Sequence, residues 1–367
     1  VYKRQVHGSD GATNLTAANK ASRLESMFGA KGYDYIGDSS ADIPVWQSAR
    51  EGFVARPRAA FLQMLKLKGL TPTPIGSPWR KRDLLRALRP HQWLKNMLLF
   101  LPLIAAHRLD AEGIFSVILG VIAFSALASS IYIVNDLIDL DADRQHETKC
   151  KRPFASGAVP IKVGMAASLG LGLLGMVLGA FLGPWMLVVL LVYLVSTLSY
   201  SMHLKRVRWV DVTMLAGLYT LRVVAGAVAG GVEASGWLFG FIFPIFLSLG
   251  CVKRLTELSR AKGEGYLPGR RYQAKDRDDL LNVAIIAGVG AVSVFTAYSL
   301  SDAAAALYYP VKLLWFVAVL LAAWLTRMVW TGWRGEQDYD PIIFAITDRI
   351  GMALFLLAVA VLVYAGG

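Results

Sequence analysis

The stretch IYIVNDLIDLDADRQHETKCKRPFASG, residues 131–157, decides the fold class and the expected chemistry of this 367-residue chain. An apolar helical pattern runs into it from Ile114, so its first residues lie at the end of a span of membrane length. Asp136, Asp139 and Asp143 follow at steps of three and four. This spacing predicts that the three carboxylates share one face of a helix, with Asp141 on the opposite face.

Three carboxylates on one helix face repel one another unless a cation lies between them. Hard oxygen ligands suit Mg²⁺, which keeps several waters and takes substrate phosphate oxygens to complete its shell. We therefore predict a magnesium site with the ligands Asn135, Asp136, Asp139 and Asp143. Lys149 and Arg152 follow closely and would neutralise a metal-bound diphosphate. The alternative is a solvated helix end with ordinary surface charge.

The composition is that of a membrane protein with several spans and a polar appendage. Hydrophobic residues make up 55% of the chain and charged residues only 17%. The net charge of +12 is concentrated in loops between apolar spans, which indicates membrane topology rather than a nucleic-acid partner. The two cysteines, Cys150 and Cys251, form no paired motif, which argues against a disulfide framework or a zinc site.

Nine apolar spans are expected between residues 92 and 367, and most approach the length that crosses a bilayer. Their approximate ranges are 93–109, 113–135, 161–181, 184–202, 210–231, 236–253, 281–300, 307–330 and 345–366. Lys and Arg gather before the first span and in every second connection. This pattern predicts a cytoplasmic amino terminus, cytoplasmic site loops and an external carboxyl terminus in a bacterial-type plasma membrane.

The first 91 residues divide into two parts. Residues 1–57 read as a partial α/β unit, with helices at 17–30 and 41–49 and strands at 33–36 and 52–55. Residues 58–91 read as a junction. Within it, residues 58–68 form a basic amphipathic helix that we expect to lie on a membrane surface, and residues 71–78 form a linker.

Further polar residues lie at or inside the later spans. Arg222 falls within the fifth span, where an unpaired arginine costs roughly 2.5–3.5 kcal/mol. A substrate phosphate would offset that cost, as would an acidic partner on another helix. We expect the following residues to bind substrate: Lys95, Asn135, Lys149, Arg152, Tyr200, Lys205, Arg222, Lys253 and Arg254. For Tyr200 the alternative is an interfacial anchor, and for Lys205 it is topological charge.

The pattern N-D-x-x-D-x-x-x-D at 135–143, followed by K-x-x-R-P-x-A-S-G at 149–157, resembles the UbiA superfamily of intramembrane transferases. The segments RPHQWLKN at 89–96 and YSMHLKRVRWVD at 200–211 are most similar to its decaprenyl-phosphate phosphoribosyltransferase-like branch. The resemblance implies an all-α, nine-helix UbiA-type bundle. It also implies Mg²⁺-dependent transfer in which Asp136, Asp139, Asp143 and Asp211 take part.

By this resemblance the donor is phosphoribosyl diphosphate, the acceptor is a polyprenyl phosphate, and diphosphate is released. The alternative is prenyl transfer from a prenyl diphosphate to an aromatic or other small acceptor. Members of that kind commonly carry a second D-x-x-x-D, whereas Leu215 stands at its second position here. A membrane transporter is an alternative of another class, but no clear internal repeat favours it.

Lys20 and the segment YDYIGDSSADIPVW at 33–46 resemble the carboxy-terminal part of haloacid dehalogenase (HAD)-type phosphatases. The resemblance implies that Lys20 steadies a phosphoryl group and that Asp38 and Asp42 help to hold Mg²⁺. The nucleophilic aspartate of that family precedes this part on a strand that the sequence does not contain. We therefore expect this unit to be inactive in the present chain.

Overall fold

The structure is a computed structural model that describes residues 7–9, 14–261, 266–267, 270–337 and 340–366. The chain forms two compact units. The first contains residues 1–84 together with 146–160, and the second contains residues 85–145 and 161–367. Each unit is described by itself.

The first unit contains a parallel three-stranded sheet in the order β1-β2-β3. Its strands are β1 (Tyr35–Gly37), β2 (Gly52–Ala55) and β3 (Thr73–Ile75). The helices are α1 (Ala17–Phe28), α2 (Ile43–Ser48) and α3 (Ala59–Leu67), and the short 3₁₀ turns are η1 (Ser40–Asp42) and η3 (Lys149–Lys151). The predicted α/β character is confirmed. The segment expected to be a plain linker contributes β3, whose Pro74 is tolerated in an edge strand.

Helix α3 was expected to lie on a membrane surface, and the structure differs. Parallel strands need a crossover connection, usually a helix, and α3 is the connection between β2 and β3. Its Leu65 is fully buried and packs in one cluster with Trp46 and Val54. The apolar side of this helix therefore faces the sheet, and the α/β unit extends beyond residue 57.

In the described part of the second unit, eight helices are long and apolar enough to cross a membrane. They are α6 (Ala111–Ile138), α8 (Ile161–Phe181), α9 (Pro184–Met202), α10 (Val210–Gly230), α11 (Gly236–Arg260), α12 (Arg277–Ser299), α14 (Leu313–Trp333) and α16 (Arg349–Gly366). The boundary between the two units falls within α4 (Lys81–Ala87). The shorter elements of the second unit are η2 (Pro90–Phe100), α5 (Leu101–Ala105), α7 (Leu140–Gln145), η4 (Leu204–Arg206), η5 (Ala274–Asp276), α13 (Asp302–Leu307) and α15 (Pro341–Thr347). The predicted helical membrane bundle is confirmed.

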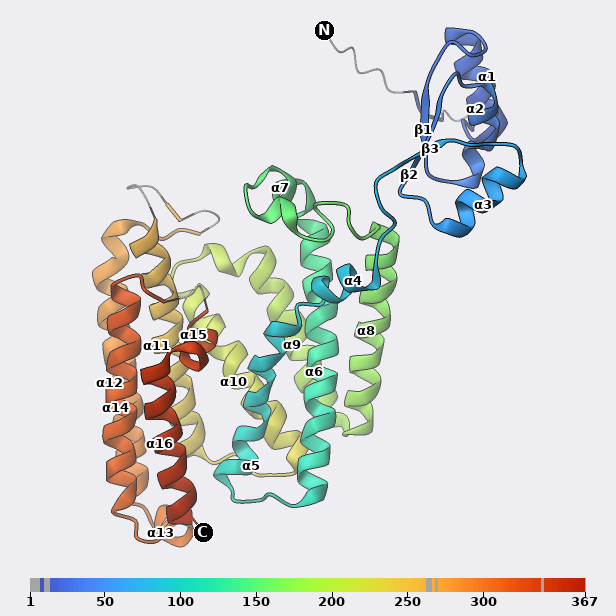
Figure 1. Ribbon diagram of the computed structural model, residues 1–367. Helices are drawn as coiled ribbons and strands as arrows, with labels where there is room; N and C mark the ends of the chain where they lie inside the picture. Colours follow the sequence, from blue (N-terminus) through green and yellow to red (C-terminus); the bar gives the residue numbers. More distant parts are fainter. Residues whose placement is uncertain (1–6, 10–13, 262–265, 268–269, 338–339, 367) are drawn as a thin grey trace. The chain divides into compact units, whose positions relative to one another are not determined.

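The first predicted span, residues 93–109, is not one long α-helix. It consists of the 11-residue 3₁₀ helix η2 and the five-residue helix α5. Prolines at 90 and 102 interrupt regular α-helical hydrogen bonding there. Because a 3₁₀ helix rises about 2.0 Å per residue, η2 and α5 together extend about 30 Å, the thickness of the hydrocarbon core. Figure 1 shows this segment beside α6, so a 3₁₀ helix followed by a short α-helix stands where a ninth long α-helix was expected.

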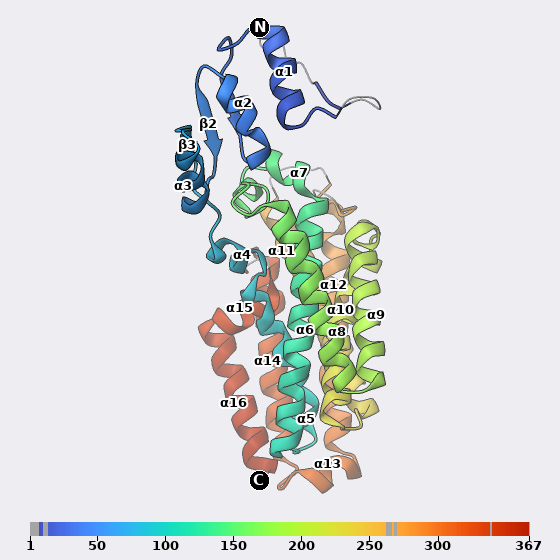
Figure 2. The ribbon, with the colours of Figure 1, turned by 90° about the vertical axis from the view of Figure 1, so that its right-hand side faces the viewer.

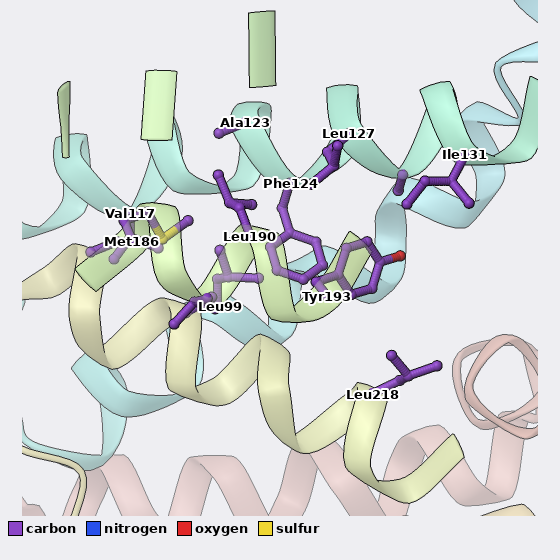
Figure 3. Packing of buried hydrophobic residues seen from close by; sticks show 14 of the residues in the cluster. Leu99, Val117, Ala123, Phe124, Leu127, Ile131, Met186, Leu190, Tyr193 and Leu218 are labelled. Carbon is purple, nitrogen blue, oxygen red and sulfur yellow. The ribbon is translucent and has the colours of Figure 1, made fainter. Parts of the chain in front are cut away.

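Helix α10 is central to the bundle and packs against α6, α9, α11 and η2 (Figures 1 and 2). Between α6 and α9, the rings of Phe124 and Tyr193 lie 4.2 Å apart in a cluster that also contains Leu99 of η2 (Figure 3). Gly226 brings α10 very close to η2, because a Cβ there would lie 1.9 Å from the carbonyl oxygen of Leu99. Small residues such as glycine allow helices to pack this closely in a membrane.

Candidate active site

The acidic residues at the end of α6 lie across a junction between two helices. Helix α6 ends at Ile138, Asp139 caps it, and α7 begins at the next residue. Asp136 and Asp143 are 3% exposed, whereas Asp139 is exposed. The prediction of one continuous helix face is therefore corrected: the chain bends at Asp139. Asp141 points outward, with a side chain that is 91% exposed and 3.4 Å from Arg144.

Asp136 forms an ion pair with Arg89, whose Nη2 lies 2.6 Å from a carboxylate oxygen. Arg89 adopts a left-handed backbone conformation with φ of 54° just before η2, and its guanidinium also lies over the ring of Tyr132. Asn135 donates a hydrogen bond to Ser201 at the end of α9. In the sequence, Arg89 belongs to the positive charge before the first span and to the segment RPHQWLKN, and no local pattern indicated Asp136 as its partner.

The residue types at this junction fit Mg²⁺, but they do not form a ready-made cage. Among the residues that the structure describes, no group of three or more acidic, histidine or cysteine side chains is close enough to hold a metal ion. Mg²⁺ usually takes one or two carboxylates and completes its shell with water and substrate phosphates. Asp136 and its neighbours supply that chemistry, and the ion pair with Arg89 shows that a positive charge is already accommodated beside Asp136.

A second cluster lies where α9, α10 and α11 meet, and its centre is the fully buried Asp211. Tyr200 donates a hydrogen bond to its carboxylate at 2.8 Å, Arg254 forms a two-point ion pair with it, and Arg270 lies at 3.0 Å. Arg254 is itself fully buried and also binds both carboxylate oxygens of Glu257 at 2.8 Å. The two negative charges of Asp211 and Glu257 therefore balance the two positive charges of the guanidinium groups.

This network brings together Tyr200, Asp211 and Arg254, which the sequence singled out. Arg270 was missed, because it lies in the connection after α11, 59 residues from its partner Asp211. The sequence showed only that Arg270 is a basic residue in a loop. Both carboxylate oxygens of Asp211 bind guanidinium groups, so Asp211 positions Arg254 and Arg270 in this structure.

Arg222 of α10 is buried, with 5% exposure, and its described partners are neutral. Its nitrogens donate to Asn96 Oδ1 at 3.0 Å, to the carbonyl oxygen of Leu218 at 2.7 Å and to Tyr193 Oη at 3.3 Å. The guanidinium also lies 5.2–5.4 Å from the ring centroids of Phe124, Tyr193 and Tyr219. These contacts satisfy hydrogen bonds but leave its positive charge without a carboxylate among the described residues.

Two lysines lie in the same region. Lys95 of η2 is 7% exposed, pairs with Asp340 and lies 5.8 Å from the ring centroid of Tyr219. Lys253 of α11 is half-buried within electrostatic reach of Lys95 and Asp340, and it has no hydrogen-bond or ion-pair partner in the described part of the chain. We call Lys95, Arg222 and Lys253 the central cations. Among the described residues, the ion pair between Lys95 and Asp340 is the only one that a central cation forms.

The remaining predicted substrate contacts lie in loops. Lys205 is half-buried in η4, between α9 and α10. Lys149 is exposed in η3, and Arg152 directly follows that turn and is half-buried. Both residues belong to the segment 146–160, which forms part of the first unit. Their roles as substrate ligands stay predictions.

In the first unit, Lys20 and Asp42 meet at the carboxyl end of β1, 2.9 Å apart. Tyr35 accepts a hydrogen bond from Lys20 and donates one to Asp42. The hydrogen bonds to Tyr35 and Asp42 raise the pKa of Lys20 to about 12. Burial opposes ionisation of Asp42, but hydrogen bonds from Lys20, Tyr35 and two backbone amides hold its pKa below the ordinary value. Asp38 is exposed beside this pair, and the likeness to HAD-type phosphatases stays a prediction.

Comparisons with known proteins identify related sequences and a shared fold. The sequence model of the UbiA prenyltransferase family matches residues 97–357. The protein y4nM of Sinorhizobium fredii is 34% identical over 355 residues, which make up 93% of this chain and 67% of that protein. The decaprenyl-phosphate phosphoribosyltransferase of Mycobacterium tuberculosis is 34% identical over 190 residues. That match spans 49% of this chain and 61% of that enzyme.

Among solved structures, a UbiA homolog from Archaeoglobus fulgidus bound to DMAPP and Mg²⁺ has the same fold, with a TM-score of 0.57 and 18% identity. The likeness covers 76% of this chain and 98% of that one. The family match, the apolar helices and the shared fold make this an integral membrane protein and a transferase. The chain belongs to the UbiA prenyltransferase family.

Proposed function

We propose that this chain transfers a phosphoribosyl group from phosphoribosyl diphosphate to a polyprenyl phosphate and releases diphosphate. The observation that carries the proposal is that Arg222 and Lys253 form no ion pair with a described carboxylate. Arg222 is buried with neutral partners, and Lys253 has no acidic partner among the described residues. Burying such charge is costly unless an anion offsets it. Both proposed substrates bring phosphates.

The identity to decaprenyl-phosphate phosphoribosyltransferase, 34% over about half of this chain, supports phosphoribosyl transfer in particular. The central cations would bind the diphosphate of the donor and stabilise the charge that develops as its bond to the anomeric carbon breaks. An oxygen of the lipid phosphate forms the new bond to that carbon, and diphosphate leaves. The apolar helices around the site keep out water that would otherwise capture the electron-poor carbon.

Asp136, Asp139 and Asp143 would hold Mg²⁺, with Asn135 as a further oxygen ligand. Bound Mg²⁺ supplies additional positive charge to the leaving diphosphate. Arg89 would orient the Asp136 carboxylate at the end of α6. Asp211 would act indirectly, by holding Arg254 and Arg270 in position.

Prenyl transfer is the second candidate. The likeness in fold to the Archaeoglobus homolog bound to DMAPP and Mg²⁺ favours a prenyl diphosphate donor, and an aromatic or other small molecule would then be the acceptor. Both reactions release diphosphate from an electron-poor carbon. The two reactions therefore differ in the group that is transferred and in the acceptor.

The test uses purified protein in detergent with Mg²⁺ and two substrate pairs in parallel. One pair is labelled phosphoribosyl diphosphate with a polyprenyl phosphate, and the other is labelled prenyl diphosphate with an aromatic acceptor. We expect label in a lipid product only from the first pair, and loss of that product in Asp136→Ala. Product from the second pair alone would refute phosphoribosyl transfer in favour of prenyl transfer.

A further inference from the structure

An apolar groove runs between α12 and α14, which lie side by side (Figure 1). It encloses about 580 Å³, which is within the range of ligand-binding sites. Its walls are stripes of apolar residues at helical spacing, including Leu281, Gly288 and Val292 on α12 and Leu325, Val329 and Trp333 on α14. We call it the α12–α14 groove.

The groove exists because small residues leave space between the two helices. At Gly288, an added Cβ would meet only Ser248 at 3.7 Å and Leu325 at 3.9 Å, which is ordinary contact. Ile285 and Val289 on the same wall are 46% and 61% exposed, so the groove opens to the outside of the bundle. In a membrane protein this outside is the apolar part of the bilayer.

One end of the groove, where α12 begins and α14 ends, carries two tryptophans and a cation. Arg277 lies 5.2 Å from the ring centroid of Trp333 and donates a hydrogen bond to the carbonyl oxygen of that residue at 2.7 Å. The Nε of Arg277 is buried without a hydrogen-bond partner, and no carboxylate pairs with Arg277 among the residues that the structure describes. Arg334 lies over the ring of Trp330, but unlike Arg277 it has a carboxylate partner, Glu336, at 2.9 Å.

We propose that the α12–α14 groove binds an anionic membrane phospholipid, with an acyl chain along the groove and the phosphate at Arg277. The apolar groove suits an acyl chain, and the indole rings at its end suit the interfacial region of the lipid. The cation beside them suits a negatively charged headgroup. The groove shares no residue with the central cations. Under the proposed function the lipid phosphate reacts beside those cations, so this separation favours a resident phospholipid over the polyprenyl substrate, and the choice of occupant rests on that proposed function.

The first test measures the headgroup contact. Native mass spectrometry of the purified full chain gives dissociation constants for phosphatidylglycerol and for phosphatidylcholine. One basic residue near a membrane surface contributes enough that its loss should weaken phosphatidylglycerol binding about fivefold. We expect this loss in Arg277→Gln, with phosphatidylcholine binding unchanged. Lys275→Gln removes an exposed charge two residues earlier and should bind both lipids as the wild type does.

The second test fills the groove. Gly288→Leu should weaken the binding of both lipids, because its side chain occupies the space for the acyl chain. Gly290→Leu is the matched control, since Gly290 lies on the same helix, does not line the groove and has no neighbouring atom within 4 Å of an added Cβ. Ala322→Leu fills the opposite wall if Gly288→Leu does not fold.

Three outcomes would overturn the proposal. The first is equal lipid binding in the Gly288 and Gly290 variants. The second is equal phosphatidylglycerol affinity in Arg277→Gln and Lys275→Gln. The third is a Gly288→Leu protein that no longer binds a polyprenyl phosphate but still binds phosphatidylglycerol, because the groove would then be a substrate site.

Discussion

Replacing Asp211 by asparagine tests whether its carboxylate holds the site together or takes part in the chemistry. The side chains of Asp211 and Arg254 are both fully buried. Asparagine keeps the size of the side chain but removes its charge, so the guanidinium groups of Arg254 and Arg270 lose their shared partner. Removing one member of a buried ion pair costs about 3–5 kcal/mol. Arg254 keeps Glu257 at 2.8 Å and Arg270 is 22% exposed, so we expect about 3 kcal/mol.

The assay is thermal unfolding of the detergent-solubilised protein, followed by tryptophan fluorescence, for Asp211→Asn, Arg254→Met and the double variant. The double variant should be destabilised by less than the sum of the single changes, because neither charge is then left without the other. Asp141→Asn is the control and should unfold as the wild type does, since its side chain is exposed. Wild-type stability of Asp211→Asn together with loss of turnover would refute the positioning role and place the carboxylate in the reaction.

Three further predictions concern the acids of α6, the central cations and the first unit. Asp136→Ala should abolish labelled lipid formation while Asp141→Ala retains most of it, and equal losses would contradict the buried–exposed distinction. Arg222→Met should raise the KM for the diphosphate donor about tenfold or more, by the strength of a charged hydrogen bond, and an unchanged KM would make Arg222 structural. The lowered pKa of Asp42 and the raised pKa of Lys20 mean that their pairing stabilises the first unit fully between about pH 4 and pH 10. This stabilisation is lost as pH falls through the Asp42 pKa or rises through about 12, so the hydrogen-exchange protection factors of residues 33–48 should fall in acid, and Asp42→Asn should remove that dependence.

Apolar runs were enough to predict the membrane bundle, because each long helix is specified by residues next to one another in the chain. The first crossing was predicted with the wrong helix type. Its prolines are visible in the sequence, but its side chains bind distant partners: Lys95 binds Asp340, and Asn96 binds Arg222 and Ser125. A local window contains none of these contacts.

In the candidate site, too, locally specified features were predicted and features that depend on distant contacts were not. The sequence placed Arg222 inside a span and identified its charge as needing a partner, because both follow from local composition. It did not show that the partners are neutral, since Asn96 lies 126 residues earlier and Tyr193 lies 29 residues earlier. Arg270 was missed for a related reason, because its role depends on how the connection after α11 folds back to Asp211.

The contact between η2 and α10 links helix packing to the proposed chemistry. Gly226 allows the backbone of η2 to approach α10 at Leu99, because a side chain at position 226 would collide with the carbonyl oxygen of Leu99. In a 3₁₀ helix residues three apart lie on the same side, so the approach of Leu99 also brings Asn96 to α10. Arg222 lies one helical turn before Gly226, and its Nε is 3.0 Å from Asn96 Oδ1. The contact between Gly226 and Leu99 thus places the neutral side-chain oxygen of Asn96 beside Arg222, and the positive charge of Arg222 stays available to a phosphate.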